Sequence, residues 1–558
     1  MLDLSNTVRH VYDQVREQPI QARPRATRRI TARAWPRVVT VAAVLALTTI
    51  AINARRPSYL LSHPFWFDEA WVADSVRAPL GQLRMVTSST PIGWTLLLRV
   101  VPPLGGPERY RLLPLAFGVA SVVPAWLLGR HLRGVAGWVA APLAGLAVAL
   151  GPASLFRPGL KQFSAEVFVT LLLVWALATL ERTWSPRRQL LFGLLVAACF
   201  LVAHSAALVA AAAFGGLAVS SLLRGAWRRL AWVALTAAGV GAVQSAIYMA
   251  FVAPADSATM RTYWMRLFIP TDQGLDGAAA FVGARGARFL AFLGLGSWPV
   301  ALGLALVGVA ALAWARLPAT AMVAPLLLVE LIGTGLAGRY PFLDPRTSQF
   351  FLVLVTVVAA LGVGALVGGL ARSRWTVALG VALPLALGAS FAPASARAIH
   401  GSIVTENVRG QIQLVLSGRR FGDVVVVSSG ASNAFGYYWP APPILVDKPT
   451  FGTVTFQVSY PHEPDVVVAT GRDRGSDLDA LSRVPAGARR VWIVVGHERL
   501  ETWARLAERL GRVVAPASDP CRPFPPAAQA HARASNRQCP LLVELRPGGS
   551  GARLAAAP

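Results

Sequence analysis

Long apolar runs recur along most of the chain, and they limit its possible folds more than any other feature. The first covers 38–52, and a helix needs about 20 mostly apolar residues to cross the hydrocarbon core of a bilayer. Ten further runs follow at 112–129, 135–152, 165–180, 189–203, 206–223, 230–252, 290–314, 318–337, 349–370 and 375–392. We therefore predict a polytopic α-helical membrane protein with about eleven transmembrane helices, in which 189–223 could alternatively form one kinked helix.

The composition excludes the ordinary soluble classes. Hydrophobic residues make up 54% of the 558 residues and charged residues only 14%, whereas soluble domains carry about 25% charged residues. So little charge cannot cover the surface of a soluble protein of this size, which excludes a cytosolic enzyme, a disordered chain and a secreted disulfide scaffold. The net charge of +26 comes almost entirely from arginine. Because no basic soluble segment carries the aromatic platforms of nucleic-acid binders, we expect no nucleic-acid partner.

The arginines are distributed unevenly between the loops, and this asymmetry predicts the orientation. With 1–37 in the cytoplasm, the short basic loops fall on the cytoplasmic side, as the positive-inside rule requires. These loops are 130–133, 181–188, 224–229, Arg316 and 372–374, whereas the long segments 55–111, 153–164, 253–289, 338–348 and 393–558 fall outside. We expect a cytoplasmic Arg-rich tail 1–37, a transmembrane domain 38–392 and an extracytoplasmic domain 393–558. A bias toward Arg, Ala, Val and Gly is typical of GC-rich bacterial genomes, so the membrane is predicted to be a bacterial cytoplasmic membrane.

The C-terminal segment has the pattern of a small α/β domain. Short β-branched runs at 423–428, 464–469 and 491–496 indicate strands, and apolar residues at helical spacing over 499–510 indicate a helix. Strands that alternate with helices are typical of α/β folds. Outside the cytoplasm, Cys521 and Cys539 could form a disulfide.

The first outside loop contains the most informative motif, His63-Pro-Phe-Trp-Phe-Asp68-Glu69-Ala-Trp71. Its aromatic residues are expected to pack at the membrane interface. Two carboxylates in such a partly dehydrated setting are candidates for general-base or metal chemistry, and the alternative is a solvated turn. His63 and His204 are weak candidates for metal ligands, because structural histidines are more common.

Here the sequence resembles a known family, the GT-C membrane glycosyltransferases of the protein O-mannosyltransferase and lipid A aminoarabinose transferase kind, in their bacterial, actinobacterial branch. An Asp-Glu pair in the first outside loop marks that family. Further similar motifs are Ser89-Thr-Pro91 before Trp94, Glu108-Arg-Tyr-Arg111 before Pro114, Phe156 through Glu166, and Arg339 through Arg346. The third motif is similar to the bacterial variant in which Lys-Gln-Tyr-Ser precedes an Asp, with Phe163 replacing the Tyr and Glu166 the Asp.

The resemblance implies a GT-C-like fold and a sugar donor, hexose or pentose, carried on a polyprenyl phosphate. Asp68 would act as the general base of an inverting transfer, and Glu69 as an orienting residue or metal neighbour. Cations suited to the donor phosphate are Lys161, Arg346, Arg111 and Arg157, and candidates for the substrate pocket are Gln162, Arg261, Tyr263 and Trp264. A divalent metal is a possible cofactor, because only some relatives use one.

Several of these residues could instead have a purely structural role. Lys161 could be an interfacial cation that snorkels to the surface, and Trp264 could anchor the protein at the interface. Two other functions also stay open: a transporter of an envelope precursor, or a non-catalytic envelope assembly protein. The sequence identifies neither the sugar nor the acceptor, which could be a protein, a lipid or a glycan.

Overall fold

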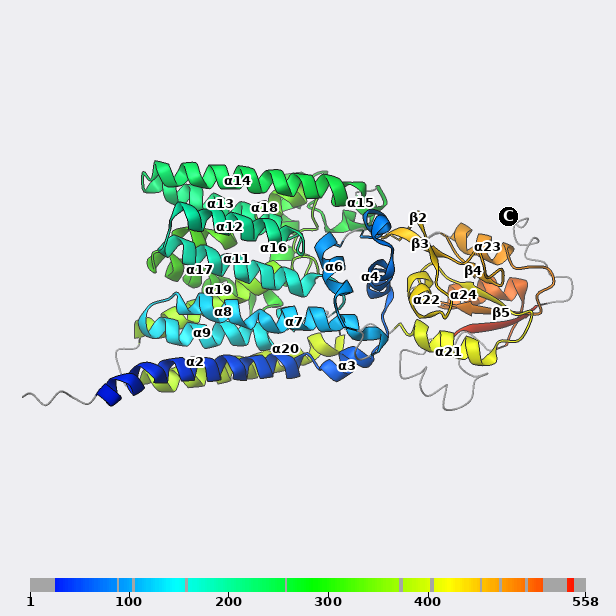
Figure 1. Ribbon diagram of the computed structural model, residues 1–558, viewed down its shortest axis with the longest axis horizontal. Coiled ribbons are helices and arrows are strands. Elements are labelled where there is room, and N and C mark those ends of the chain that lie inside the picture. Colours follow the sequence, from blue (N-terminus) through cyan, green and yellow to red (C-terminus); the bar gives the residue numbers. More distant parts are fainter. Residues whose placement is uncertain are drawn as a thin grey trace, which may run out of the picture. The chain divides into compact units, whose positions relative to one another are not determined.

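The computed structural model describes residues 26–87, 90–102, 106–155, 159–255, 258–370, 375–401, 406–451, 454–470, 474–496, 500–514 and 539–545 (Figure 1). The chain divides into two compact units, 1–46 and 47–558. Helix α2 (Ala26–Ala54) begins in the first unit and ends in the second. The second unit contains both the remaining apolar helices and the C-terminal strands.

Apolar helices form most of the chain between 26 and 401. After α2 come α7 (Leu112–Ala120) and α8 (Val122–Arg130), which belong to one span over Pro107–Arg130. The long helices that follow are α9 (Gly134–Leu150), α11 (Phe163–Arg182), α12 (Pro186–Phe200), α13 (Ala206–Leu223), α14 (Trp227–Ile247), α16 (Gly274–Ala291), α17 (Trp298–Trp314), α18 (Pro318–Leu336), α19 (Gln349–Leu370) and α20 (Trp375–Gly401). Within the described residues, eight helical segments are long and apolar enough to cross a membrane. This confirms the polytopic helical class, whereas the count of eleven stays a prediction.

Three details differ from the sequence pattern. The apolar stretch 189–223 forms two helices, α12 and α13, separated at 201–205, rather than one kinked helix. The run predicted at 290–314 is interrupted before Trp298, because Gly294 and Gly296 adopt positive φ angles there. Helix α20 continues to Gly401, so the predicted domain boundary at 393 falls inside a helix.

Helix α19 occupies the centre of the helical region, where it packs against α9, α11 and α17 (Figure 1). Close approach depends on its glycines. A Cβ at Gly364 would lie 2.6 Å from the Cβ of Ala140 on α9, and one at Gly362 would lie 2.1 Å from the carbonyl oxygen of Leu304 on α17. Small residues at such crossings are the usual means by which membrane helices pack closely.

The segments that connect the long helices fold into short ones. These are α3 (Pro57–Ser62), α4 (Phe67–Arg77), α5 (Leu83–Val86), α6 (Ile92–Arg99), α10 (Pro152–Leu155) and α15 (Ala258–Trp264). Phe65, Phe67, Trp71 and Trp94 are fully buried, so the aromatic residues of the first loop form a core. The sequence predicts that these rings pack at the membrane interface, whereas the structure buries them in a core shared with C-terminal strands, so protein packing dehydrates the loop.

The C-terminal region is an α/β fold. Its main sheet has the order β4-β1-β5-β7-β6, with β4, β1 and β5 parallel and β7 antiparallel to both its neighbours. The strands are β1 (Val424–Val427), β4 (Val466–Val468), β5 (Arg490–Val494), β6 (Gly511–Val513) and β7 (Leu541–Leu545), with a separate hairpin of β2 (Ile444–Phe451) and β3 (Val454–Ser459). The helices are α21 (Val408–Gly418), α22 (Ser432–Tyr438), α23 (Arg474–Ser482) and α24 (Leu500–Leu510). The strands expected at β1, β4 and β5 and the helix at α24 are thus confirmed.

The two faces of this sheet are buried in different cores. Val424 and Val426 of β1 pack with residues of α23 and α24. Val425 and Val427 belong to a second core that also contains Phe65, Trp71 and Trp94 of the first loop. The sheet region therefore shares a hydrophobic core with the loop that carries the Asp-Glu pair. Of the two C-terminal cysteines, Cys539 is disulfide-bonded and Cys521 lies outside the described residues.

Candidate functional site

Two cationic side chains from distant parts of the chain, Lys161 and Arg346, meet at Asp68. Its Oδ2 atom lies 3.1 Å from Nζ of Lys161 and 3.4 Å from a terminal guanidinium nitrogen of Arg346. The exposed fractions of the three side chains are only 14%, 14% and 17%, so these ion pairs are partly shielded from water. Because the strength of a charge pair rises as water is excluded, this cluster differs from an ordinary surface salt bridge.

Each of the three residues stands at the end of a helix. Asp68 is the second residue of α4, where the helix dipole favours a negative charge. Lys161 directly precedes Gln162, the N-cap of α11, and Arg346 lies in the short loop before α19. The site is therefore built from the ends of three elements that the helical core holds together.

Aromatic residues flank the cations. The Lys161 ammonium lies 5.2 Å from the ring centre of Trp71, and the Arg346 guanidinium 5.1 Å from that of Trp264. Arg346 also donates a hydrogen bond to the hydroxyl of Tyr263 at 3.3 Å. Burial alone would lower the pKa of Arg346, but the charge of Asp68 and the bond to Tyr263 outweigh it and raise the pKa. Tyr263 and Trp264 thus lie beside the Asp68 cluster.

Glu69, the next residue, is buried with Arg111. The Arg111 Nε donates to Glu69 Oε1 at 2.8 Å, a second guanidinium nitrogen donates to Oε2, and the backbone N–H of Leu160 donates to Oε1 at 2.9 Å. The remaining N–H groups of Arg111 bond the carbonyls of Leu60, His63 and Pro64. All five guanidinium donors are therefore in use. In the structure Arg111 holds the first loop together through these bonds, and the phosphate contact expected of it stays a prediction.

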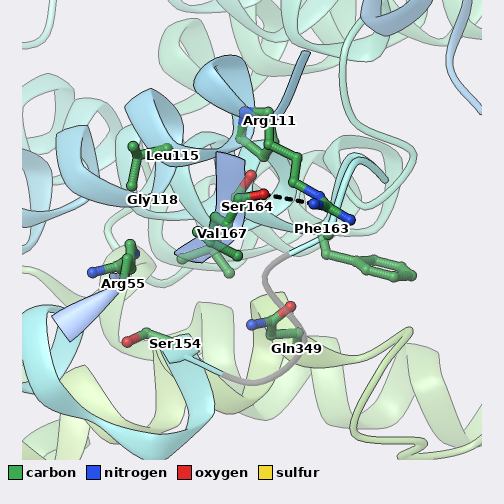
Figure 2. Close-up of a pocket in the computed structure, with 12 residues that line it drawn as sticks. Arg55, Arg111, Leu115, Gly118, Ser154, Phe163, Ser164, Val167 and Gln349 are labelled. Atoms are coloured by element: carbon green, nitrogen blue, oxygen red, sulfur yellow. Dashed lines mark hydrogen bonds between the residues drawn. The ribbon is translucent and has the colours of Figure 1, made fainter. Parts of the chain in front are cut away.

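A pocket lies beside this pair, between the ends of several helices (Figure 2). Arg111, Arg55, Ser164 and Gln349 are among its polar lining residues. Arg55, which the sequence reasoning did not single out, is 5% exposed and donates to the carbonyls of Ala51, Val148 and Ala149. It satisfies carbonyls at the C-terminus of α9, where a cation is favoured. An arginine that follows an apolar run gives no sequence signal for such a capping role.

The other candidates are placed as follows. Gln162 is buried and bonds Glu166 on the next turn of α11. Arg261 is exposed on α15, and Arg157 lies outside the described residues. The His63 ring stacks on Tyr59, and burial together with the charge of Arg111 lowers its pKa.

The metal-ligand candidates do not assemble. Among the residues that the structure describes, no three His, Cys, Asp or Glu side chains form a group that could hold a metal ion. Both oxygens of Glu69 are occupied by Arg111 and Leu160, so Glu69 does not fit the part of a metal neighbour. A divalent metal cofactor stays a prediction.

Comparison with known proteins identifies the fold. No family model matches the chain, and no curated protein matches its sequence significantly. Two structures of the Archaeoglobus fulgidus oligosaccharyltransferase are similar to it. One, in complex with Zn and sulfate, gives a TM-score of 0.51 at 12% identity over 83% of this chain and 69% of that chain. The other, of AglB with an inhibitory peptide and a dolichol-phosphate, gives 0.51 at 11% identity over 84% and 70%.

A third match is ArnT from Cupriavidus metallidurans in the apo state, with a TM-score of 0.48 at 12% identity over 93% of this chain and 99% of that chain. The fold of the protein is that of the GT-C membrane glycosyltransferases. This confirms the fold that the sequence motifs implied.

Proposed function

We propose that the protein is a membrane glycosyltransferase that moves a sugar from a polyprenyl-phosphate donor to a hydroxyl acceptor on the outer face of the cytoplasmic membrane. The observation that carries this proposal is the contact of Asp68 with both Lys161 and Arg346. One carboxylate and two cations lie together, and the two cations stand just before the apolar helices α11 and α19, within a GT-C fold. This combination would supply a base and an anion-binding site next to a lipid phase.

The donor phosphate would bind to Lys161 and Arg346. Their present partner, Asp68, is itself an anion that occupies the place a phosphate oxygen would take. A guanidinium can bond two phosphate oxygens at once, and a lysine ammonium serves as a point charge. A donor that binds here would therefore replace Asp68 as the partner of the cations and leave its carboxylate next to the sugar.

The chemical step would then be a single displacement. The acceptor oxygen attacks C1 of the sugar, and the bond from C1 to the phosphate oxygen breaks on the opposite side, which inverts the configuration. Asp68 accepts the proton of the acceptor hydroxyl, and polyprenyl phosphate leaves with its negative charge held by Lys161 and Arg346. A positioned base of this kind contributes roughly 10²–10⁴-fold to the rate.

Aromatic neighbours support a sugar pocket at the same place. Trp264 lies under Arg346, and Tyr263 bonds its guanidinium, so both rings stand beside the proposed phosphate position. A tryptophan face suits the apolar side of a pyranose. Glu69 and Arg111 would fix the loop that presents Asp68 rather than contact the substrate.

One experiment separates the proposal from the alternatives. The purified protein is given a radiolabelled polyprenyl-phosphate sugar together with a cell-envelope fraction as the acceptor pool. Label that moves to the acceptor fraction, with release of polyprenyl phosphate, supports the transferase. Saturable uptake of the labelled lipid into proteoliposomes without transfer would instead favour a transporter. Neither transfer nor uptake over several donor sugars would favour an assembly protein.

A further inference from the structure

The helix that carries Asp68 has no N-terminal cap of its own. The N-cap residue of α4 is Trp66, whose side chain makes no capping hydrogen bond. The first turn of a helix has backbone N–H groups without partners in the helix, and Ser, Thr, Asp or Asn usually satisfies one of them. The sequence before α4 offers only Pro64 and aromatic residues. The backbone N–H of Glu69 bonds the carbonyl of Trp66 within this segment, whereas the N–H of Phe67 bonds a partner from elsewhere in the chain.

The C-terminal region bonds the backbone at the start of α4 and just before it. The backbone N–H of Phe67, the residue before Asp68, donates to Oε2 of Glu406 at 2.9 Å. The backbone N–H of Phe65 donates to the Tyr438 hydroxyl at 2.7 Å, and this hydroxyl donates to Glu108 at 2.8 Å. Glu406 and Glu108 are 4% and 1% exposed, so water competes little for these bonds. Burial and the neighbouring Glu108 raise the pKa of Tyr438 well above its usual value, so its hydroxyl keeps the proton that it donates.

These bonds act on the backbone at one place. The two N–H groups lie within three residues of Asp68, and their acceptors lie 339 and 373 residues away in the sequence. The carboxylate of Glu406 at the start of α4 also suits the positive end of the helix dipole. Helix α22, which carries Tyr438, packs along α4 (Figure 1).

We propose that Glu406 and Tyr438 are positioning residues for the transfer, through which the C-terminal region sets the place of the Asp68 carboxylate. The inference rests on the proposed function of Asp68. Catalysis depends steeply on such placement, since a shift of about 1 Å in a reacting group can cost roughly 100-fold in rate. The C-terminal region would then be a part of the catalytic unit and not only a module that binds the acceptor.

The same interface provides a matched control. Tyr437 precedes Tyr438 on α22, and its hydroxyl donates at 2.6 Å to the carbonyl of Pro107, a residue outside α4 and outside the segment just before it. Its ring also lies 3.7 Å from the Arg77 guanidinium, a contact that phenylalanine would keep. Tyr437→Phe and Tyr438→Phe therefore each remove one buried hydroxyl between the same two regions, but only the second loosens the backbone next to Asp68.

The test compares Glu406→Ala, Glu406→Gln, Tyr438→Phe and Tyr437→Phe in the full-length protein. We expect Glu406→Ala and Tyr438→Phe to lower kcat by about 10-fold or more, with the KM for the donor unchanged. Glu406→Gln keeps an acceptor oxygen and should recover most of the lost rate, and Tyr437→Phe should transfer like the wild type. If Glu406→Ala and Tyr438→Phe keep the kcat of Tyr437→Phe, the positioning role is refuted.

A second readout does not depend on activity. Amide hydrogen exchange of a peptide that covers 65–77 should speed up in Glu406→Ala and Tyr438→Phe but not in Tyr437→Phe. If the wild-type protein transfers no sugar but the variants show this exchange pattern, the proposed function is overturned and the contact of Glu406 with α4 still stands. Unchanged exchange in both variants would overturn the positioning role, even in an active enzyme.

Discussion

Glu69→Gln provides the most quantitative test of the site's construction. Glu69 is 2% exposed, and three N–H groups bond its carboxylate, two from Arg111 and one from Leu160. Glutamine has nearly the same shape but replaces one acceptor oxygen with an NH₂ donor. In either orientation of the amide, its NH₂ group faces at least one N–H group of Arg111 or Leu160. The positive charge of Arg111 also loses its negative partner. Breaking a buried ion pair on one side costs about 3–5 kcal/mol.

This cost should appear as a lower thermal unfolding temperature of the protein purified in detergent, with activity lost in proportion to folded protein. The control is Asp479→Asn. Asp479 pairs with Arg483 at 3.3 Å, but the two side chains are 57% and 43% exposed. Such a pair contributes at most about 1 kcal/mol. A Glu69→Gln protein that unfolds like the wild type but transfers no sugar would refute the structural role and point to Glu69 as a reacting group.

Three further predictions concern the donor, the pH response and the topology. Lys161→Ala and Arg346→Ala should each weaken inhibition by added polyprenyl phosphate by roughly 10-fold or more, since a hydrogen bond to a charged group contributes about 1.5–3 kcal/mol; unchanged inhibition would make both simple flanking charges. Burial raises the pKa of Asp74 well above its usual 3.8, so the folded protein keeps a proton that the unfolded chain loses, and stability falls as pH rises from about 4 toward the folded pKa. Asp74→Asn should therefore gain unfolding temperature relative to the wild type between pH 5 and pH 8, whereas a constant difference would contradict the buried neutral acid. A cysteine placed at Ser476 should react with a membrane-impermeant reagent on intact cells, and labelling only after lysis would reverse the proposed orientation.

Local patterns predicted the parts of the protein that local physics controls. The length of an apolar run predicted helices such as α19, and runs of β-branched residues predicted β1, β4 and β5. These patterns are visible in the sequence because each element consists largely of buried apolar residues. The charge pattern of the loops predicted that Asp68, Lys161 and Arg346 lie at the same end of the helices. Opposite charge then explains why Asp68 contacts each of the two cations.

Other features depend on pairings that no local window contains. Strand β7 (Leu541–Leu545) inserts between β5 and β6, so its place is set by partners that precede it in the chain. Glu406 caps α4 from 339 residues away, and nothing in its own neighbourhood marks it. The bonds of Arg111 to Glu69 and to three backbone carbonyls also join residues 42 to 51 positions apart, so no local pattern announced them.

The central claim is that Asp68 is the base and that Lys161 and Arg346 hold the donor phosphate. The most direct measurement is sugar transfer by Asp68→Asn, together with its affinity for polyprenyl phosphate. Asparagine keeps the size of the side chain but cannot take the proton, and it removes the anion that competes for the two cations. We predict a loss of transfer of roughly 10²–10⁴-fold with affinity for polyprenyl phosphate retained or increased. Wild-type transfer by Asp68→Asn would show that this carboxylate is not the base and would contradict the account at its centre.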